Sequence, residues 1–234
     1  MPNLTMLLGN FNVYAYRDRT LLPGRLLGTV VRSDLYERVL AAEQKIGRYA
    51  LNAKLVILDS ARPRVTQAAL HLNARRAFYS SGRYPDLASA AAAAHSVARN
   101  PALTPSADHL TGAAVDVVLV NAMTGLPFED DIARYDQWGW QMKPHAYDRL
   151  QYDDIGSPLS RRRAAMATRE FCVRSALSEV GLLVSPDEAC QASLPDFLDS
   201  TIEQVQMELA QFMVCRPPFD LEQNLLNQCR SHTC

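Results

Sequence analysis

The spacing of apolar residues along the chain predicts several amphipathic helices. Leu35, Val39 and Ile46 recur at helical intervals behind a Ser33/Asp34 cap, which predicts a helix over residues 33–49. Similar spacing and end signals predict helices over residues 66–79, 86–99 and 160–180, and one more after Ser200. Pro217 and Pro218 are expected to end that last helix, which leaves a C-terminal tail.

Short runs of β-branched and aliphatic residues predict buried strands. Lys54 to Asp59 (KLVILD) and Ala113 to Val120 (AAVDVVLV) have strand length and few polar positions, and a shorter run from Leu182 leads towards Glu188. A carboxylate inside such a strand, as at Asp116, needs a partner. The polar and aromatic segment 127–158 between these elements is expected to be a long ordered loop.

Composition and charge exclude several functional classes. The 234 residues carry 24 basic and 25 acidic side chains, and this balance argues against a nucleic-acid or anionic membrane partner. No apolar run approaches the roughly 20 residues that span a bilayer, and the N-terminus lacks a signal-peptide pattern, so a cytoplasmic location is expected. Five cysteines spread over the chain do not indicate a disulfide framework.

The strongest candidate chemistry lies around the second long strand. His109 precedes Gly112 by three residues and Asp116 by seven, so that an imidazole and a carboxylate can converge on one cation. The alternative is a loop histidine near a strand aspartate that pairs with an arginine. Arg62 follows Asp59 at the end of the first strand, and Pro63 favours an extended conformation for it.

Three segments resemble motifs of one enzyme family. His109, Gly112, Ala114 and Asp116 match S-x-H-x-x-G-x-A-x-D, with Ala107 where that pattern has Ser. Asp59-Ser60-Ala61-Arg62-Pro63 is similar to the strand-end segment W-D-x-Y-R-P, and Glu188-Ala189-Cys190-Gln191 stands where the family has E-x-x-H. The chain therefore resembles the D-alanyl-D-alanine dipeptidases of the vancomycin-resistance type, which are zinc DD- and LD-peptidases.

This resemblance implies a fold class and a domain organisation. The family has a hedgehog-like α+β fold, with a central antiparallel sheet flanked by helices. The similarity covers about residues 9 to 192, so a dipeptidase-like domain is expected over 1–192. Residues 193–234 are then an additional C-terminal helix and tail, which pack on that domain or extend from it.

The resemblance also implies a role for each matching residue. His109 and Asp116 would hold Zn²⁺, with Gln191 at the position of the family's third ligand, a histidine. A carboxamide oxygen is a poorer zinc donor than imidazole, so zinc binding is expected to be weakened. Glu188 would be the general base and acid, and Arg62 would stabilise the transition state. Asp59 and Cys190 are expected at the substrate.

Other side chains can complete such a metal site. Cys190 faces the same side of a regular strand as Glu188, and a thiolate is a good zinc ligand. His145 and the terminal Cys229, His232 and Cys234 are further candidates, although the tail cysteines are expected to be disordered and reduced. His71 and His95, in predicted helices, are expected to be core or surface residues rather than ligands.

The leading functional prediction is a divergent hydrolase that cleaves a small peptide or peptide-like amide, with an amino-acid-derived substrate as its partner. One alternative is a metal-independent enzyme recruited to small-molecule biosynthesis, in which Cys190 acts as a nucleophile. The other is a non-catalytic binding homologue, in which the C-terminal helix mediates association.

Overall fold

The computed structural model describes most of the predicted elements. The described residues are 3–7, 26, 28–49, 52–103, 108–125, 128, 158–185, 191–195, 202–213 and 219–231. Within them the chain forms 6 α-helices and two antiparallel sheets, which confirms the predicted α+β class. No helix in this part of the chain is long and apolar enough to cross a membrane.

The chain divides into two units, each assembled from separate segments. The first unit comprises Met1–Ser33, Asp59–Ala113 and Asp196–Cys234, and the second comprises Asp34–Leu58 and Ala114–Pro195. The division at residue 192 into a body and a C-terminal segment stays a prediction.

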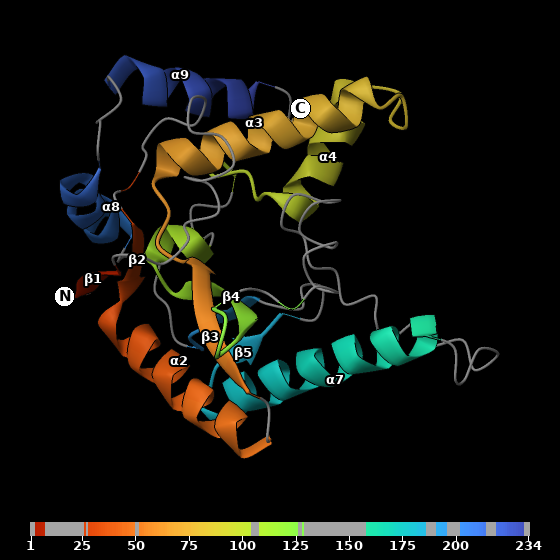
Figure 1. Cartoon of the computed structure of the whole chain (residues 1–234). Coiled ribbons are helices and arrows are strands. Elements are labelled where there is room, and N and C mark those ends of the chain that lie inside the picture. Colours follow the sequence, from red (N-terminus) through yellow and green to blue (C-terminus); the bar gives the residue numbers. More distant parts are fainter. Residues whose placement is uncertain are drawn as a thin grey trace. The chain divides into compact units, whose positions relative to one another are not determined.

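The first unit consists of a two-stranded antiparallel sheet and four α-helices among its described residues. The strands are β1 (Leu4–Leu7) and β2 (Thr29–Arg32), and the helices are α3 (Arg64–Ser80), α4 (Leu87–Val97), α8 (Ile202–Phe212) and α9 (Phe219–Arg230). A short 3₁₀ helix, η2, covers Asp108–Thr111. Helix α3 packs against both α4 and α9, and α8 packs against β1 and η2 (Figure 1).

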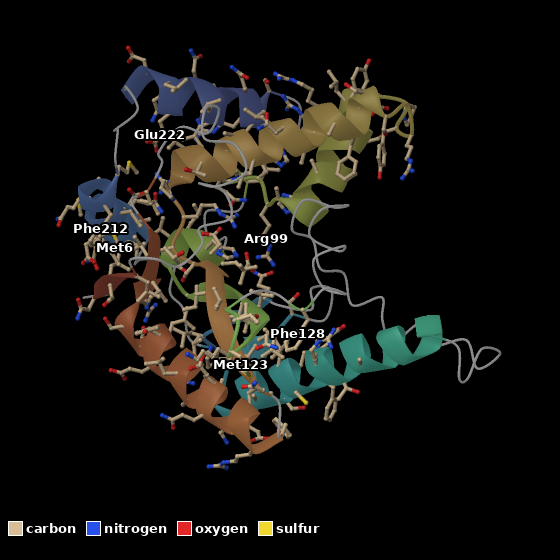
Figure 2. All side chains as sticks on the ribbon, viewed as in Figure 1. Met6, Arg99, Met123, Phe128, Phe212 and Glu222 are labelled. Carbon is tan, nitrogen blue, oxygen red and sulfur yellow. The ribbon has the colours of Figure 1, made fainter. Side chains whose placement is uncertain are left out.

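Two apolar clusters hold the C-terminal helices to the first unit. Val205 and Leu209 of α8 pack with Leu4, Val30 and Ala61, and Figure 2 shows Met6 and Phe212 side by side at this cluster. Leu226 and Cys229 of α9 pack against Ala68 and Leu72 of α3. The sequence predicted a tail after Pro218, and the finding of α9 corrects this expectation.

The second unit contains a four-stranded sheet with the order β3-β4-β6-β5. Its strands are β3 (Ala53–Asp59), β4 (Ala114–Asn121), β5 (Leu183–Val184) and β6 (Gln191–Ser193). Strand β6 is antiparallel to both β4 and β5. The Ala122 amide donates to the Asn52 carbonyl, so the end of β4 lies beside the start of β3.

Two helices complete the second unit. They are α2 (Ser33–Ile46), which is followed by the 3₁₀ helix η1 (Gly47–Tyr49), and α7 (Pro158–Glu179). The Arg38 guanidinium on α2 donates to the carbonyls of Val180 and Gly181, and Lys45 pairs with Glu179 at 2.8 Å. Arg169 on α7 lies 4.6 Å from the ring centre of Phe128, which is labelled in Figure 2.

Several predicted helix and strand ends are confirmed. Asp86 caps α4 by accepting a 2.7 Å hydrogen bond from the Ser89 amide. Helix α7 ends at Glu179, and the φ of 78° at the following Gly181 allows the Leu182 amide to reach the Leu177 carbonyl. By contrast, β6 was not predicted, and the proposed loop 127–158 lies outside the described residues except at its two ends, 128 and 158.

Candidate metal centre

Asp59 is the last residue of strand β3, and its buried carboxylate accepts hydrogen bonds from the Ser60 amide and from Arg62. Its Oδ1 accepts from the Ser60 amide at 2.9 Å, and its Oδ2 accepts from Nε and Nη2 of Arg62 at 2.9 and 2.5 Å. Both side chains are almost fully buried. A buried charge needs such pairing, because desolvation costs several kcal/mol for each ion. Asp59 and Arg62 therefore form a buried ion pair.

Arg62 also donates hydrogen bonds to Gln67 and to the backbone of the first unit. Its Nη1 donates to Oε1 of Gln67, and Nε2 of Gln67 donates in turn to the Arg99 carbonyl at 2.8 Å. The Arg62 amide donates to the His109 carbonyl at 2.9 Å. The guanidinium plane is thus fixed by a carboxylate and a carboxamide, and the Arg62 backbone is tied directly to the segment that carries His109.

His109 lies in η2 with its ring orientation set by the backbone. Its Nδ1 lies 2.8 Å from the Ser60 carbonyl, which can only accept, so Nδ1 carries the proton. In the neutral ring the lone pair then sits on Nε2, the arrangement found when a histidine binds a metal through that nitrogen. This observation supports the predicted role of His109 as a ligand.

Gly112 is required in the turn between His109 and β4. Its φ of 67° lies in the left-handed region, and a Cβ there would come within 3.2 Å of Cγ of Arg32 and 3.4 Å of Cβ of Ala61. The glycine of the H-x-x-G-x-A-x-D motif thus has a physical reason in this chain. It lets η2 turn into β4 and deliver Asp116 two residues into the strand.

Asp116 lies directly opposite Gln191 in the sheet. The two residues are partners in the antiparallel register of β4 and β6, so their side chains share one face with Cβ atoms about 5 Å apart. Gln191, which the sequence analysis placed at the third ligand position, is therefore adjacent to Asp116. The nearby Glu188 and Cys190, predicted as catalytic and substrate-binding residues, lie outside the described residues.

Three of these side chains form one group that can hold a metal ion. Asp59, His109 and Asp116 each offer a ligand atom, and these atoms lie within 4.8 Å of one another. It is the only such group of His, Cys, Asp and Glu found in the part of the chain that the structure describes. One imidazole nitrogen and two carboxylate oxygens suit a divalent cation such as Zn²⁺ or Mn²⁺.

The inclusion of Asp59 differs from the predicted ligand set. The sequence assigned Asp59 to the substrate and placed Gln191 with His109 and Asp116 at the metal. The signal for Asp59 was available in principle, since it ends a strand next to the one that carries Asp116. Asp59 was not predicted as a ligand because an aspartate three residues before an arginine is more readily interpreted as its ion-pair partner, which it also is.

The remaining candidate ligands divide into two groups. His145, His232 and Cys234 lie outside the described residues. Cys229, expected in a disordered tail, is instead buried in α9 against α3, and burial raises the pKa of its thiol to about 11. A thiol this resistant to ionisation is a poor ligand, so Cys229 has a structural role.

His71 and His95 have structural positions, as predicted. His71 is buried in α3, where its Nδ1 donates to the Ala98 carbonyl at 2.8 Å at the end of α4. Burial lowers the pKa of this imidazole, and a smaller contribution from Arg75 acts in the same direction. The Asn100 amide donates to Nδ1 of His95 at 3.1 Å, so both rings help to connect α3, α4 and the segment that follows.

No family model matches the chain, and no curated protein matches it. This is an α+β protein in which a buried arginine and carboxylate pair adjoins a histidine and a second aspartate, in an arrangement that can hold a divalent cation.

Proposed function

We propose that this chain is a metal-dependent amide hydrolase of the D-alanyl-D-alanine dipeptidase-like type, acting on a small peptide or peptide-like amide. The single observation that supports this most is the grouping of His109 and Asp116 with Asp59, which itself pairs with Arg62. The hedgehog/DD-peptidase fold belongs to the same proposal, and the sheet with Asp116 opposite Gln191 supports it.

A divalent ion bound here would lower the pKa of a coordinated water and polarise a substrate carbonyl. His109 would bind through Nε2, since Nδ1 is committed to Ser60, and Asp116 would bind through a carboxylate oxygen. Gln191 is near enough to Asp116 to offer its carboxamide oxygen. This oxygen is a weaker donor than the family's histidine, so the proposal includes reduced metal affinity.

Arg62 would stabilise negative charge on the substrate oxygen. Hydrogen bonds from its Nε, Nη1 and Nη2 to Asp59 and Gln67 fix the plane of the guanidinium before substrate arrives. A cation that is already oriented in a buried site needs no reorganisation when charge develops, and such electrostatic stabilisation is worth a few kcal/mol. The ion pair thus supports the catalytic role of Arg62 and does not compete with it.

Glu188 would move the proton from the attacking water to the leaving amine. This role comes from the resemblance, in which Glu188 precedes the third ligand position by three residues. Gln191, at that position, begins β6 beside Asp116. General acid and base catalysis typically contributes about 10²- to 10⁴-fold, so Glu188→Gln should lower turnover by at least about 100-fold with little change in metal content.

The test uses the full chain stripped with a chelator and reloaded with Zn²⁺ or Mn²⁺. Bound metal and hydrolysis of D,D- and L,D-dipeptides are measured together for wild type, for Asp116→Asn and for the control His95→Gln. We expect Asp116→Asn to lose both metal and turnover, and the control to keep both. A chain that binds neither metal and hydrolyses neither class of dipeptide contradicts the proposal.

The metal-independent alternative has one observation in its favour. Both oxygens of Asp59 already accept hydrogen bonds, from Ser60 and from Arg62, so that this carboxylate is well satisfied without a cation. Turnover that survives saturating chelator and is lost on alkylation of Cys190 would favour this alternative. Dipeptide binding without any turnover would favour the non-catalytic homologue.

A further inference from the structure

Helix α8 presents one face to both segments that carry the candidate site residues of the first unit. Ile202 packs on Leu110, the residue after His109. Val205 and Leu209, on the same face, pack with Ala61, the residue before Arg62. The helix therefore contacts the immediate neighbours of both residues, although it belongs to a part of the chain that has no counterpart in the resemblance.

Gln206 lies on this face and directs its whole carboxamide to backbone groups of those segments. Its Nε2 donates to the Arg62 carbonyl at 3.0 Å and to the Leu110 carbonyl at 3.1 Å. Its Oε1 accepts from the Arg64 amide at 2.7 Å. One side chain thus joins two segments that are separated by almost fifty residues, and it does so next to Arg62 and His109.

The Arg64 contact has a second consequence for the helix that follows. Helix α3 begins at Arg64, and its N-cap is Pro63, which has no side chain able to cap the helix. The first amides of a helix lack partners within the helix and are usually satisfied by a Ser, Thr, Asp or Asn cap. Oε1 of Gln206 takes this place from another helix, so it fixes the start of α3 directly after Arg62.

Only glutamine has the required combination of groups at this position. Glutamate has the same length but no donor for the two carbonyls, and methionine has neither donor nor acceptor of comparable strength. Exposed glutamines at 204 and 211 on the same helix make no described contact with either segment. Gln206 therefore differs from the other two glutamines of α8 in its position on the helix, which places its carboxamide against both segments.

We propose that Gln206 is a positioning residue, which holds the Arg62 and His109 segments at a fixed separation, and that α8 is thereby a working part of the site. This inference rests on the proposed function for its consequence in catalysis. It gives the C-terminal segment a role that the resemblance does not provide. The Arg62 amide also donates directly to the His109 carbonyl, and Gln206 binds the carbonyls of Arg62 and Leu110 beside this contact.

The test compares Gln206→Met with Gln211→Met in the full chain. The first readout is the dissociation constant for Co²⁺, followed by its visible absorption. Loss of a group that orients metal ligands typically weakens binding by about 10- to 100-fold, which is the change expected for Gln206→Met alone. The second readout needs no metal: solvent exchange of the Arg62 Nε proton by NMR, which we expect to accelerate about tenfold in the same variant.

The two readouts separate the possible results. If Gln206→Met lowers the melting temperature but leaves Co²⁺ affinity and Arg62 proton exchange equal to those of Gln211→Met, the residue is only structural and the inference is wrong. If Gln206→Met fails to fold, Gln206→Glu keeps the acceptor for Arg64 and removes both donors, and the same expectations apply to it. If wild type binds no Co²⁺ and hydrolyses nothing, the proposed function fails, whereas the exchange of the Arg62 proton still decides the positioning role.

Discussion

Replacing Asp59 with asparagine is the most direct perturbation of the candidate site. The Asp59 and Arg62 side chains are 3% and 6% exposed, and Oδ2 lies 2.5 Å from Nη2. Asparagine keeps the size and one acceptor, but it leaves the guanidinium buried without a counter-charge from Asp59. Removing one partner of a buried pair typically costs about 3–5 kcal/mol, so we expect this loss in the free energy of unfolding.

A second ion pair of the same unit provides a control. Arg64 and Glu203 are also 2.5 Å apart, but their side chains are 22% and 74% exposed. The two ion pairs therefore have the same N···O distance and differ in how far their side chains are buried. Exposed pairs contribute about 0–1 kcal/mol, so Glu203→Gln should lower the free energy of unfolding by less than about 1 kcal/mol.

The assay is urea unfolding in the presence of EDTA, followed by fluorescence and circular dichroism. EDTA removes metal, so that a loss of stability cannot come from a lost ligand. A double-mutant cycle adds Arg62→Met and the double variant, in which neither charge remains. We expect the double variant to be more stable than the sum of the two single losses predicts, with a coupling energy of about 2–3 kcal/mol.

Two results would refute this reasoning. One is a loss below about 1 kcal/mol for Asp59→Asn in EDTA, which would show that the buried pair has little value. The other is additivity of the two single variants, which would show that the two charges do not interact in the folded state. A loss that appears only with added Zn²⁺ would instead identify Asp59 mainly as a metal ligand.

Two further predictions concern parts of the chain away from this pair. Burial lowers the pKa of His71, so the unfolded chain binds this proton more readily than the folded chain does. The free energy of unfolding is therefore highest above about pH 6.5, the ordinary pKa of histidine. Below that pH it falls by up to about 1.4 kcal/mol per pH unit. His71→Gln should remove this component from the urea midpoints measured between pH 8 and 5, and an unchanged pH dependence would contradict it. Gly181→Ala should cost about 1–2 kcal/mol in thermal unfolding, since φ is 78° and a Cβ would meet Nη1 of Arg38 at 2.8 Å. Gly47→Ala, with no neighbour within 4 Å, should cost nothing, and equal losses at both positions would show that strain at Gly181 is not the cause.

Strong periodicity made much of the secondary structure predictable. Leu35, Val39 and Ile46 are all buried on one face of α2, as their spacing indicated, and the apolar run before Asp59 forms β3. Short or tertiary-dependent elements were missed. Strand β6 has 3 residues, which is too few for a pattern, and it exists because it pairs with both β4 and β5.

Helix α9 shows a different reason for failure. It follows two prolines in a polar segment, and this composition reads as a tail. The sequence nevertheless has helix signals, since Leu221, Leu225 and Cys229 recur every four residues and the first turn is acidic. Leu225, Leu226 and Cys229 pack on α3, which lies over a hundred residues earlier in the chain, and this packing stabilises the helix.

The site residues that belong to the motifs were predictable, and the two glutamines that hold the backbone around them were not. Arg62, His109 and Asp116 stand at recognisable spacings, and their side chains are types that perform chemistry. Gln67 and Gln206 have no spacing signal. All the contacts given for Gln206 and one of those of Gln67 are with backbone carbonyls and amides, which every residue offers, and the other contact of Gln67 is with Arg62. Glutamines of this kind can be found only when the fold shows which of them are directed at the site.

If the proposed function holds, the formal charges of the described site groups are consistent with glutamine at position 191, where the resembled family has histidine. Asp59 and Asp116 contribute −2 and Arg62 contributes +1, which leaves −1 when His109 is neutral. A divalent cation would change this sum to +1, and a single negative charge developing on a substrate oxygen would bring it to zero. A neutral histidine and a neutral glutamine leave this balance the same. Under the proposed function, glutamine at this position would therefore weaken metal binding through donor strength, and the electrostatic preference for an oxyanion would be retained.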